Sequence, residues 1–141
     1  KTLEFNTRMG DPETQPIMMR LKTDLFDVLM AATSGRLDEV ELQWDRRVAL
    51  GVVLAAGGYP LAPKRGDTIT GVPKPVDDAV VFHAGTVAEG DQLKTAGGRV
   101  LCVTALADSV KQAQAKAYDV ARGIHFDGVQ YRRDIGHRAL A

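Results

Sequence analysis

The stretch "RRVALGVVLAAGGYP", residues 46–60, decides the fold class of this chain. From Val48 to Ala56 nearly every side chain is apolar, as in a strand that is covered on both faces. Gly57, Gly58 and Pro60 then end the run, since glycine and proline mark turns. The sequence therefore predicts a buried strand over residues 48–56.

Further strands are expected on the C-terminal side of this one. The segments "RGDTITGVP" (65–73) and "AVVFHAGTV" (79–87) predict two short strands, because each is bounded by glycine or proline. The segment "EGDQLKTAGGRVLCVTALA" (89–107) predicts a hairpin whose second strand, residues 99–105, is buried. A last strand and a polar tail are expected in residues 128–140. Close spacing and tight turns favour an antiparallel sheet.

A helix is predicted in "DSVKQAQAKAYDVARGI", residues 108–124. Ser109 and Gln112 have the spacing of a capping box, and Gly123 ends the helical pattern. The apolar stripe of this helix consists of Val110, Ala113, Ala117, Val120, Ala121 and Ile124. We expect this stripe to cover one face of the sheet.

The N-terminal part has a different pattern. Residues 2–8 alternate apolar and polar side chains with the period of a strand, and one long amphipathic helix is expected to follow, with apolar side chains at helical spacing from Ile17 to Ala32. Asp11 is predicted to be the N-cap of this helix, with Pro12 at the first helical position. Gly35 is a plausible left-handed terminator.

These patterns predict a division of the chain into residues 1–36, a connector at 37–45, and a domain at 46–141. A single strand and one helix cannot bury their apolar faces without a partner surface. Because the chain starts at Lys1 inside a predicted strand, we expect the N-terminal domains of a longer protein to lie upstream and to complete the first part.

Composition narrows the class of function. The 141 residues are 45% hydrophobic and 26% charged, which is typical of a soluble globular protein. Eighteen basic residues balance eighteen acidic ones, so no overall field attracts nucleic acid or a membrane surface. Small-molecule partners are therefore expected.

The single cysteine and the absence of a long apolar segment indicate a cytoplasmic location. Cys102 lies inside an apolar run, which favours a buried thiol in a reducing compartment over a disulfide or a zinc site. No apolar stretch approaches the ~20 residues of a membrane span.

The stretch "LEFNTRMGDPETQP", residues 3–16, carries the chemistry. Glu4, Asn6 and Arg8 would share one strand face, and carboxylate and amide oxygens are ligands that magnesium prefers. The planar guanidinium of Arg8 could hold a carboxylate or phosphoryl group by two hydrogen bonds. The alternative interpretation is a solvated strand face, with Asp11 as a simple helix cap.

Several quoted motifs bear on these alternatives. "EFNTRMGDPETQ" resembles the signature near the end of the ATP-grasp domain in the phosphoribosylamine–glycine ligase family. "LGVVLAAGGYP", "VFHAGT", "GGRVLCVTAL" and "DIGHRAL" resemble segments of that family's C-terminal domain, in the same order. The similarity runs from Lys1 to about Ala139. It implies an α+β fold: the last strand and helix of an ATP-grasp domain, followed by a small domain with a mainly antiparallel sheet packed by a helix.

The resemblance also implies an activity. The family joins glycine to 5-phospho-ribosylamine with ATP, through an acyl phosphate, and gives glycinamide ribonucleotide, ADP and phosphate in purine biosynthesis. Glu4 and Asn6 match the residues that bind Mg²⁺ or Mn²⁺, Arg8 would steady the acyl phosphate, and Asp11 would face the amine substrates. The fragment alone is expected to be inactive. Another ATP-grasp ligase or carboxylase, or a non-catalytic interaction domain, remains an alternative.

Other candidates have mainly structural interpretations. Gly97, Gly98 and Arg99 read as a tight turn, but by the resemblance they could offer amides and a guanidinium to the 5′-phosphate of the sugar substrate. His83 is expected to be a hydrogen-bonded structural histidine. The cluster of Arg132, Arg133 and Asp134 is expected to be a solvated, salt-bridged face.

Overall fold

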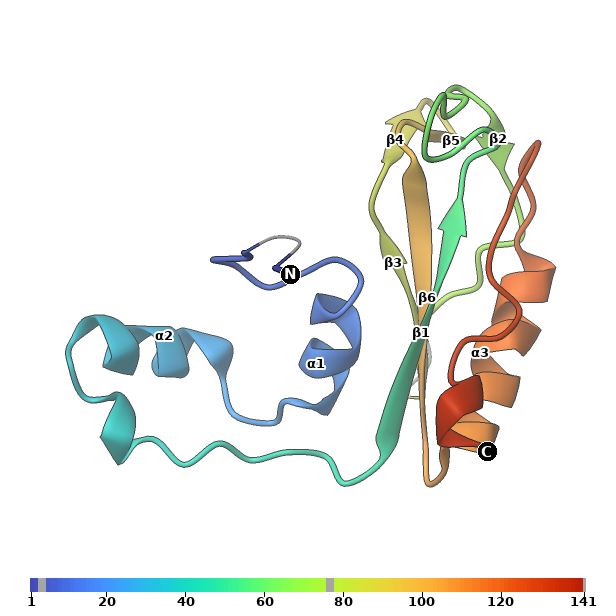
Figure 1. The fold of residues 1–141 in the computed structure, drawn as a ribbon. Helices are drawn as coiled ribbons and strands as arrows, with labels where there is room; N and C mark the ends of the chain where they lie inside the picture. The colour runs from blue at the N-terminus through green and yellow to red at the C-terminus, as the bar shows by residue number, and fades with distance from the viewer. Residues whose placement is uncertain (3–4, 76–77, 141) are drawn as a thin grey trace.

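Two small antiparallel sheets form the C-terminal part of the protein (Figure 1). The computed structural model describes residues 1–2, 5–75 and 78–140. The first sheet has the order β1 (Val48–Ala55), β6 (Arg99–Ala107) and β3 (Ala79–His83). The second has the order β2 (Thr68–Ile69), β5 (Gln92–Thr95) and β4 (Thr86–Glu89). Every pairing is antiparallel, so the predicted buried strand, antiparallel sheet and α+β class are confirmed.

The predicted hairpin over residues 89–107 is wrong, because its two strands lie in different sheets. β5 pairs with β4 and β2, whereas β6 lies between β1 and β3. The chain turns a corner at Gly97, where it crosses Gly85 so closely that a Cβ atom on Gly85 would lie 2.6 Å from the Cα atom of Gly97. The backbones can cross because neither Gly85 nor Gly97 has a side chain. At this crossing the strands divide into two separate sheets.

The helix α3 (Val110–Gly123) covers one face of the first sheet, as predicted. Ser109 caps it: the Ser109 hydroxyl accepts from the Gln112 backbone N–H at 3.3 Å and donates to the Gln112 side-chain carbonyl at 3.1 Å. Ala113, Ala117 and Ala121 are completely buried. These small side chains let the helix approach β1 and β6 closely.

The two faces of β1 have different neighbours. Leu50, Val52 and Leu54 point into the core with their β6 partners Ala105, Val103 and Leu101. Gly51 lies on the opposite face, where an added Cβ atom would lie 3.2 Å from the Pro16 ring and 3.3 Å from the Cys102 sulfur. The strand is therefore covered on both faces, by α3 on one side and by α1 (Thr14–Arg20) on the other (Figure 1).

The predicted long helix is broken into α1 and α2 (Leu25–Thr33). Between them the chain is extended, and Lys22 donates its backbone N–H to the Gln43 carbonyl at 2.9 Å. Asp24 then caps α2 by accepting from the Phe26 N–H at 2.8 Å. Backbone pairing of residues 21–22 with residues 43–45 replaces helical hydrogen bonds at this point. Helical periodicity in the sequence does not reveal such a distant partner.

The end of α2 agrees with the prediction. Gly35 has φ +68°, and the backbone N–H groups of Gly35 and Arg36 donate to the carbonyls of Ala32 and Ala31. This is the Schellman arrangement, which places glycine in the left-handed conformation just after a helix. A short 3₁₀ helix, η1 (Leu37–Glu39), follows.

Two predictions for the first twelve residues are wrong where the structure describes them. Residues 1–2 and 5–9 lie in neither a helix nor a strand, while Leu3 and Glu4 are outside the described residues. A strand needs a neighbour to pair with, and alternation alone supplies none. Asp11 is not the N-cap of α1, which begins at Thr14, because its carboxylate accepts from the Gln15 side-chain amide at 3.1 Å and pairs with Arg99.

The predicted last strand is reduced to one bridge. Gln130 exchanges both backbone hydrogen bonds with Ala55, at 2.8 and 3.0 Å. The segment then continues beside α3 to the 3₁₀ helix η2 (His137–Ala139). Because only one residue pairs with the sheet, the segment does not extend β1 as a regular strand.

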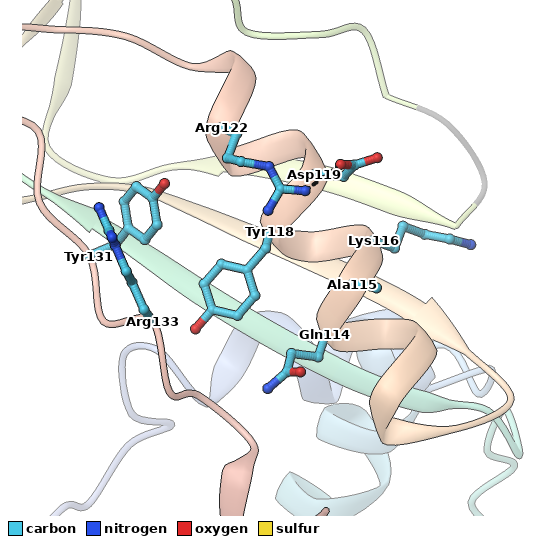
Figure 2. A pocket seen from close by; sticks show the side chains of 8 residues that line it. All are labelled: Gln114, Ala115, Lys116, Tyr118, Asp119, Arg122, Tyr131 and Arg133. Atoms are coloured by element: carbon cyan, nitrogen blue, oxygen red, sulfur yellow. Dashed lines mark hydrogen bonds and ion pairs between the residues drawn. The ribbon is translucent and has the colours of Figure 1, made fainter.

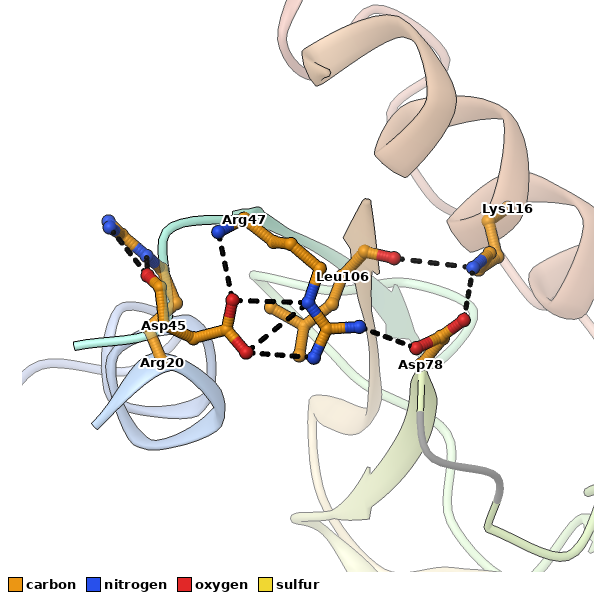
Figure 3. Close-up of polar contacts among 6 residues, drawn as sticks. All are labelled: Arg20, Asp45, Arg47, Asp78, Leu106 and Lys116. Carbon is orange, nitrogen blue, oxygen red and sulfur yellow. Dashed lines mark hydrogen bonds and ion pairs between the residues drawn. The ribbon is translucent and has the colours of Figure 1, made fainter. Parts of the chain in front are cut away.

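A charged network ties the connector to the sheet (Figure 3). Arg47 pairs with Asp45 at 2.8 Å and with Asp78 at 2.7 Å, and Lys116 of α3 pairs with Asp78 at 3.0 Å. Arg20 of α1 donates twice to the Asp45 carbonyl. The hydrogen bonds from Lys116 and Arg47 lower the pKa of Asp78. The network links α1, the connector, β3 and α3.

Candidate functional site

Asp11 and Arg99 are 88 positions apart in the sequence and meet in the structure. One terminal nitrogen of Arg99 donates to the Asp11 backbone carbonyl and lies 3.5 Å from an Asp11 carboxylate oxygen. The sequence placed both residues in candidate motifs, but it gave no reason for them to touch. Their contact joins the turn before α1 to the corner between the two sheets.

Tyr59 completes this cluster. The Arg99 Nε–H donates to the Tyr59 hydroxyl at 3.0 Å. A Cβ atom on Gly98 would lie 2.4 Å from a Tyr59 ring carbon, so the missing side chain at Gly98 makes room for the ring. Gly97 and Gly98 therefore both have a structural reason to be glycine, at the strand crossing and under the tyrosine ring respectively.

A cavity of about 520 Å³ opens beside the cluster. Its walls come from the turn before α1, one face of β1, the glycine corner and the C-terminal segment: Pro12, Gly51, Val53, Ala55, Tyr59, Arg99, Gln130, Tyr131, Arg132 and Ile135. The walls are mostly apolar, with two arginines at the edge. An apolar hollow with a few convergent polar groups is the usual form of a small-molecule site.

The surroundings of Arg99 favour the charged form of its guanidinium. The hydrogen bond to Tyr59, and then the nearby charge of Asp11, raise the pKa of Arg99. Because the guanidinium is held at two of its nitrogens, it is fixed in direction as well as in charge. An anion or a polarised carbonyl in the cavity would meet a preorganised positive group.

The other predicted site residues lie apart from this cavity. Arg8 is exposed and donates to the Met9 carbonyl at 3.4 Å. Asn6 is exposed on the same N-terminal loop, and Glu4 lies outside the described residues. Neither Asn6 nor Arg8 is among the residues that line the cavity.

The described residues do not by themselves form a complete donor set for a metal ion. Within residues 1–2, 5–75 and 78–140, no three His, Cys, Asp or Glu side chains are arranged to hold a metal ion. The Asn6 amide is a hard oxygen donor of the type that magnesium accepts, and Glu4 would add a carboxylate. This pair fits magnesium, which commonly takes few protein ligands together with phosphate oxygens and water.

A larger hollow lies between α3 and the C-terminal segment (Figure 2). Tyr118 and Tyr131 face each other there with ring centroids 6.2 Å apart. The Tyr118 hydroxyl donates to the Arg132 carbonyl at 2.7 Å and accepts from the Ile135 N–H at 3.1 Å. Gln114 also donates to the Ile135 carbonyl. These polar groups hold the C-terminal segment against the helix, so their role is structural.

The remaining candidates behave as the sequence predicted. Cys102 is buried, and burial raises the pKa of its thiol, which opposes a nucleophilic role. His83 is hydrogen-bonded to the Thr86 hydroxyl at 3.2 Å. Arg132 and Asp134 form an exposed ion pair with two hydrogen bonds.

Tyr59 and Gln130 are residues of the site to which the sequence gave no role. Gln130 donates from its side-chain amide to the carbonyls of Ala56 and Tyr59, at 3.1 and 3.0 Å. Tyr59 sits in the quoted segment "GGYP", whose glycines and proline predicted only a turn. The available signal was an aromatic residue between two turn residues, and it does not identify a partner.

Comparison with known proteins defines the class. The model of the family "Phosphoribosylglycinamide synthetase, C domain" matches residues 49–138, which is more than half of the chain. The chain therefore belongs to this family, and the resemblance found in its motifs is confirmed. No helix in the described part is long and apolar enough to cross a membrane.

Individual relatives carry one name. The phosphoribosylamine–glycine ligase of Ralstonia nicotianae is 65% identical over 140 residues, which are 99% of this chain and 33% of the relative. That of Vibrio cholerae is 55% identical over 142 residues, covering 100% of this chain and 33% of the relative. The crystal structure of phosphoribosylamine–glycine ligase from Thermotoga maritima superposes with a TM-score of 0.80 at 39% identity, over 94% of this chain and 32% of that one. The chain thus spans about a third of the length of these relatives.

Proposed function

We propose that this chain is the C-terminal portion of an ATP-dependent ligase that joins glycine to 5-phospho-ribosylamine. The products would be glycinamide ribonucleotide, ADP and phosphate, an early step of purine biosynthesis. The observation that carries this proposal is the meeting of two separated motifs, the Asp11 turn and the Gly97–Arg99 corner, at one cavity. The names of the relatives support it, although each relative is about three times longer.

The reaction consists of two group transfers. The bonds that form and break in them belong to the substrates and not to protein side chains. A glycine carboxylate oxygen attacks the terminal phosphorus of ATP, and ADP leaves. The amine nitrogen of phosphoribosylamine then attacks the acyl carbon, phosphate leaves and the nitrogen loses a proton. Such transfers depend mainly on positioning and charge neutralisation.

The N-terminal loop would hold the phosphate end of this reaction. Glu4 and Asn6 would bind Mg²⁺ or Mn²⁺ together with the nucleotide phosphates, and the metal ion would neutralise their charge. Arg8 would hold the glycine carboxylate and then the acyl phosphate. Among the described residues, its exposed guanidinium has one weak contact, to the Met9 carbonyl, so it can turn towards such an anion.

The turn before α1 and the glycine corner would hold the amine substrate. The Asp11 carboxylate would accept a hydrogen bond from the reacting amine. In the described ranges, the backbone N–H groups of Gly97 and Gly98 donate to no backbone carbonyl, so they and Arg99 could bind the 5′-phosphate.

Three regions of the chain would have different roles. Residues 1–36 would be the end of an ATP-grasp domain, residues 37–45 a connector, and residues 46–141 the domain that closes over the sugar phosphate. The N-terminal domains of the same polypeptide would supply the adenine pocket. A reducing, cytoplasmic location would suit the buried thiol of Cys102.

A rate assay on the full-length protein tests this assignment. We expect glycine-dependent ADP release in the presence of phosphoribosylamine, and turnover lower by about 100-fold or more in Glu4→Ala and Arg8→Ala. Arg36→Ala is a matched control, since Arg36 is exposed on the same arm and its ion pair within the described part of the chain is with Glu39. Wild-type rates in both site variants would disprove the proposed roles.

Two other functions are separated by substrate screening. Another ATP-grasp ligase or carboxylase would release ADP with a different carboxylate or amine and not with glycine and phosphoribosylamine. A non-catalytic interaction domain would show no metal-dependent nucleotide binding in the intact protein.

A further inference from the structure

We propose that Arg99 and Tyr59 are positioning residues that hold the Asp11–Pro12 turn at the cavity wall, so that the C-terminal domain sets the orientation of Asp11, a catalytic group on the N-terminal arm. This inference rests on the proposed function for its kinetic readout. It assigns roles to Tyr59, and a second role to Arg99, that the motif resemblance does not imply.

The first step is the grip on the turn. Arg99 contacts both the carbonyl and the carboxylate of Asp11. On the other side, the Gln15 amide donates to the second carboxylate oxygen at 3.1 Å. Asp11 is therefore held from two directions, by Gln15 of α1 and by Arg99 from the sheet corner.

The second step is what fixes Arg99. Its Nε–H donates to the Tyr59 hydroxyl, which selects one direction for the planar guanidinium. The tyrosine is itself held, because Gln130 donates to its backbone carbonyl and the Gly98 backbone lies directly against its ring. The order of contacts is Gln130, Tyr59, Arg99 and Asp11.

The third step is the location of this chain of contacts. Pro12, Tyr59, Arg99 and Gln130 all line the same cavity, and Pro12 directly follows Asp11. A shift of Tyr59 would therefore move Arg99 and the Asp11 turn together at the cavity wall. Misplacement of a reacting group by about 1 Å can lower a rate by about 100-fold.

The positioning role differs from phosphate binding in its kinetics. If Arg99 only bound the substrate phosphate, Arg99→Lys would raise KM for phosphoribosylamine, and removal of the Tyr59 hydroxyl would have little effect. If Arg99 positions Asp11, both substitutions act through the Asp11 carboxylate, which is proposed to bind the reacting amine. Turnover then falls in both variants, and KM for the sugar substrate changes less.

The experiment measures kcat and each KM for the full-length protein with Tyr59→Phe, Arg99→Lys, Asp11→Asn and the double variant Tyr59→Phe/Asp11→Asn. Tyr59→Phe removes one oxygen atom and keeps the ring against Gly98. We expect kcat to fall about 10-fold in Tyr59→Phe and by 10- to 100-fold in Arg99→Lys. In the Asp11→Asn background, Tyr59→Phe should have no further effect on kcat. Arg122→Lys serves as a control, because Arg122 lies on α3 and forms an exposed ion pair with Asp119.

Two results would overturn the inference: an unchanged kcat in Tyr59→Phe, or full additivity of the Tyr59 and Asp11 changes. Unfolding temperatures of the same variants and of the double variant Arg99→Lys/Asp11→Asn give a second readout that needs no activity. Contact between Arg99 and the Asp11 carboxylate predicts that the shifts from Arg99→Lys and Asp11→Asn are less than additive in the double variant, and additive shifts would exclude this contact. A wild-type protein that releases no ADP with glycine would disprove the proposed function alone, since this thermal cycle would still test the contact.

Discussion

The C-terminal sheet domain and the N-terminal arm, residues 1–45, bury their apolar side chains to very different extents. The sheet domain contains the described core, including the completely buried Val52, Leu54 and Leu101. In the arm only Ala31 is buried, although the arm has eight of the eleven exposed large apolar side chains of the described residues. In Figure 1 the arm extends away from the sheets, and only α1 lies against them.

This difference indicates what each region requires. The sheet domain covers β1 on both faces and supplies its own core. The arm presents Phe26, Leu29 and Met30 to solvent from one helix, α2. Exposed apolar faces of this kind commonly mark an interface. We propose that upstream domains of the same polypeptide cover the arm, in agreement with relatives that are three times longer.

The strongest test of this contrast compares two leucines. Leu54→Ala, in the core, should lower the free energy of unfolding by about 2–5 kcal/mol, because it leaves a cavity in a packed region. Leu29→Ala, at a side chain that is 56% exposed, should change it by less than about 0.5 kcal/mol in this chain. Chemical unfolding of both variants measures the difference. In the full-length protein the Leu29 effect should rise towards that of Leu54, and equal small effects in both lengths would argue against a covered arm.

A second comparison uses two glycines in the left-handed conformation. Gly71→Ala should destabilise the protein by about 2–3 kcal/mol, because φ is +74° and the new Cβ atom would lie 1.9 Å from the Gly123 carbonyl oxygen. Gly35→Ala has a similar φ of +68° with no atom within 4 Å, so it should cost only the backbone strain of about 1 kcal/mol. Thermal unfolding of both variants measures the gap, and a Gly35 cost equal to that of Gly71 would contradict the difference in packing.

Lowering the pH is expected to have a smaller effect on stability. It acts through the ion pairs of Arg47 and Lys116 with Asp78, which belong to the network that joins the two regions. The pKa of Asp78 is lower in the folded state, mainly because of Lys116 and then Arg47. Its contribution to stability is therefore complete above the unfolded pKa of about 4 and is lost as pH falls through the lower folded value. Asp78→Asn should lower the unfolding temperature at pH 6, and its difference from the wild type should shrink as the pH falls below about 4. A constant difference across that range would exclude this role for the carboxylate.

Features fixed by neighbours in the sequence were predictable. The Ser109 cap, the stripe of α3 and the glycine end of α2 each depend on residues within a few positions. The apolar run at 48–56 also identified the buried strand. The break at Leu21 was not predictable, because it results from pairing with residues 43–45.

In the candidate site, too, the residue types were predictable from the sequence and the contacts between distant residues were not. The sequence motifs named Asp11 and the Gly97–Arg99 corner separately, through residue type and resemblance. Their contact depends on α1 packing on one face of β1 and on the glycine crossing that turns β6 away from β5. Tyr59 enters the site only through that three-dimensional arrangement. The roles of Glu4, Asn6 and Arg8 stay predictions.

We propose that the exposed arm and the sheet domain together form part of a glycine-activating ligase. The most direct measurement is ADP release by the full-length protein with ATP and magnesium, with glycine and phosphoribosylamine added singly and together. We predict rapid release only when both substrates are present, and turnover about 100-fold lower in Arg8→Ala. Release that is independent of glycine, or equally fast in Arg8→Ala, would contradict the claim.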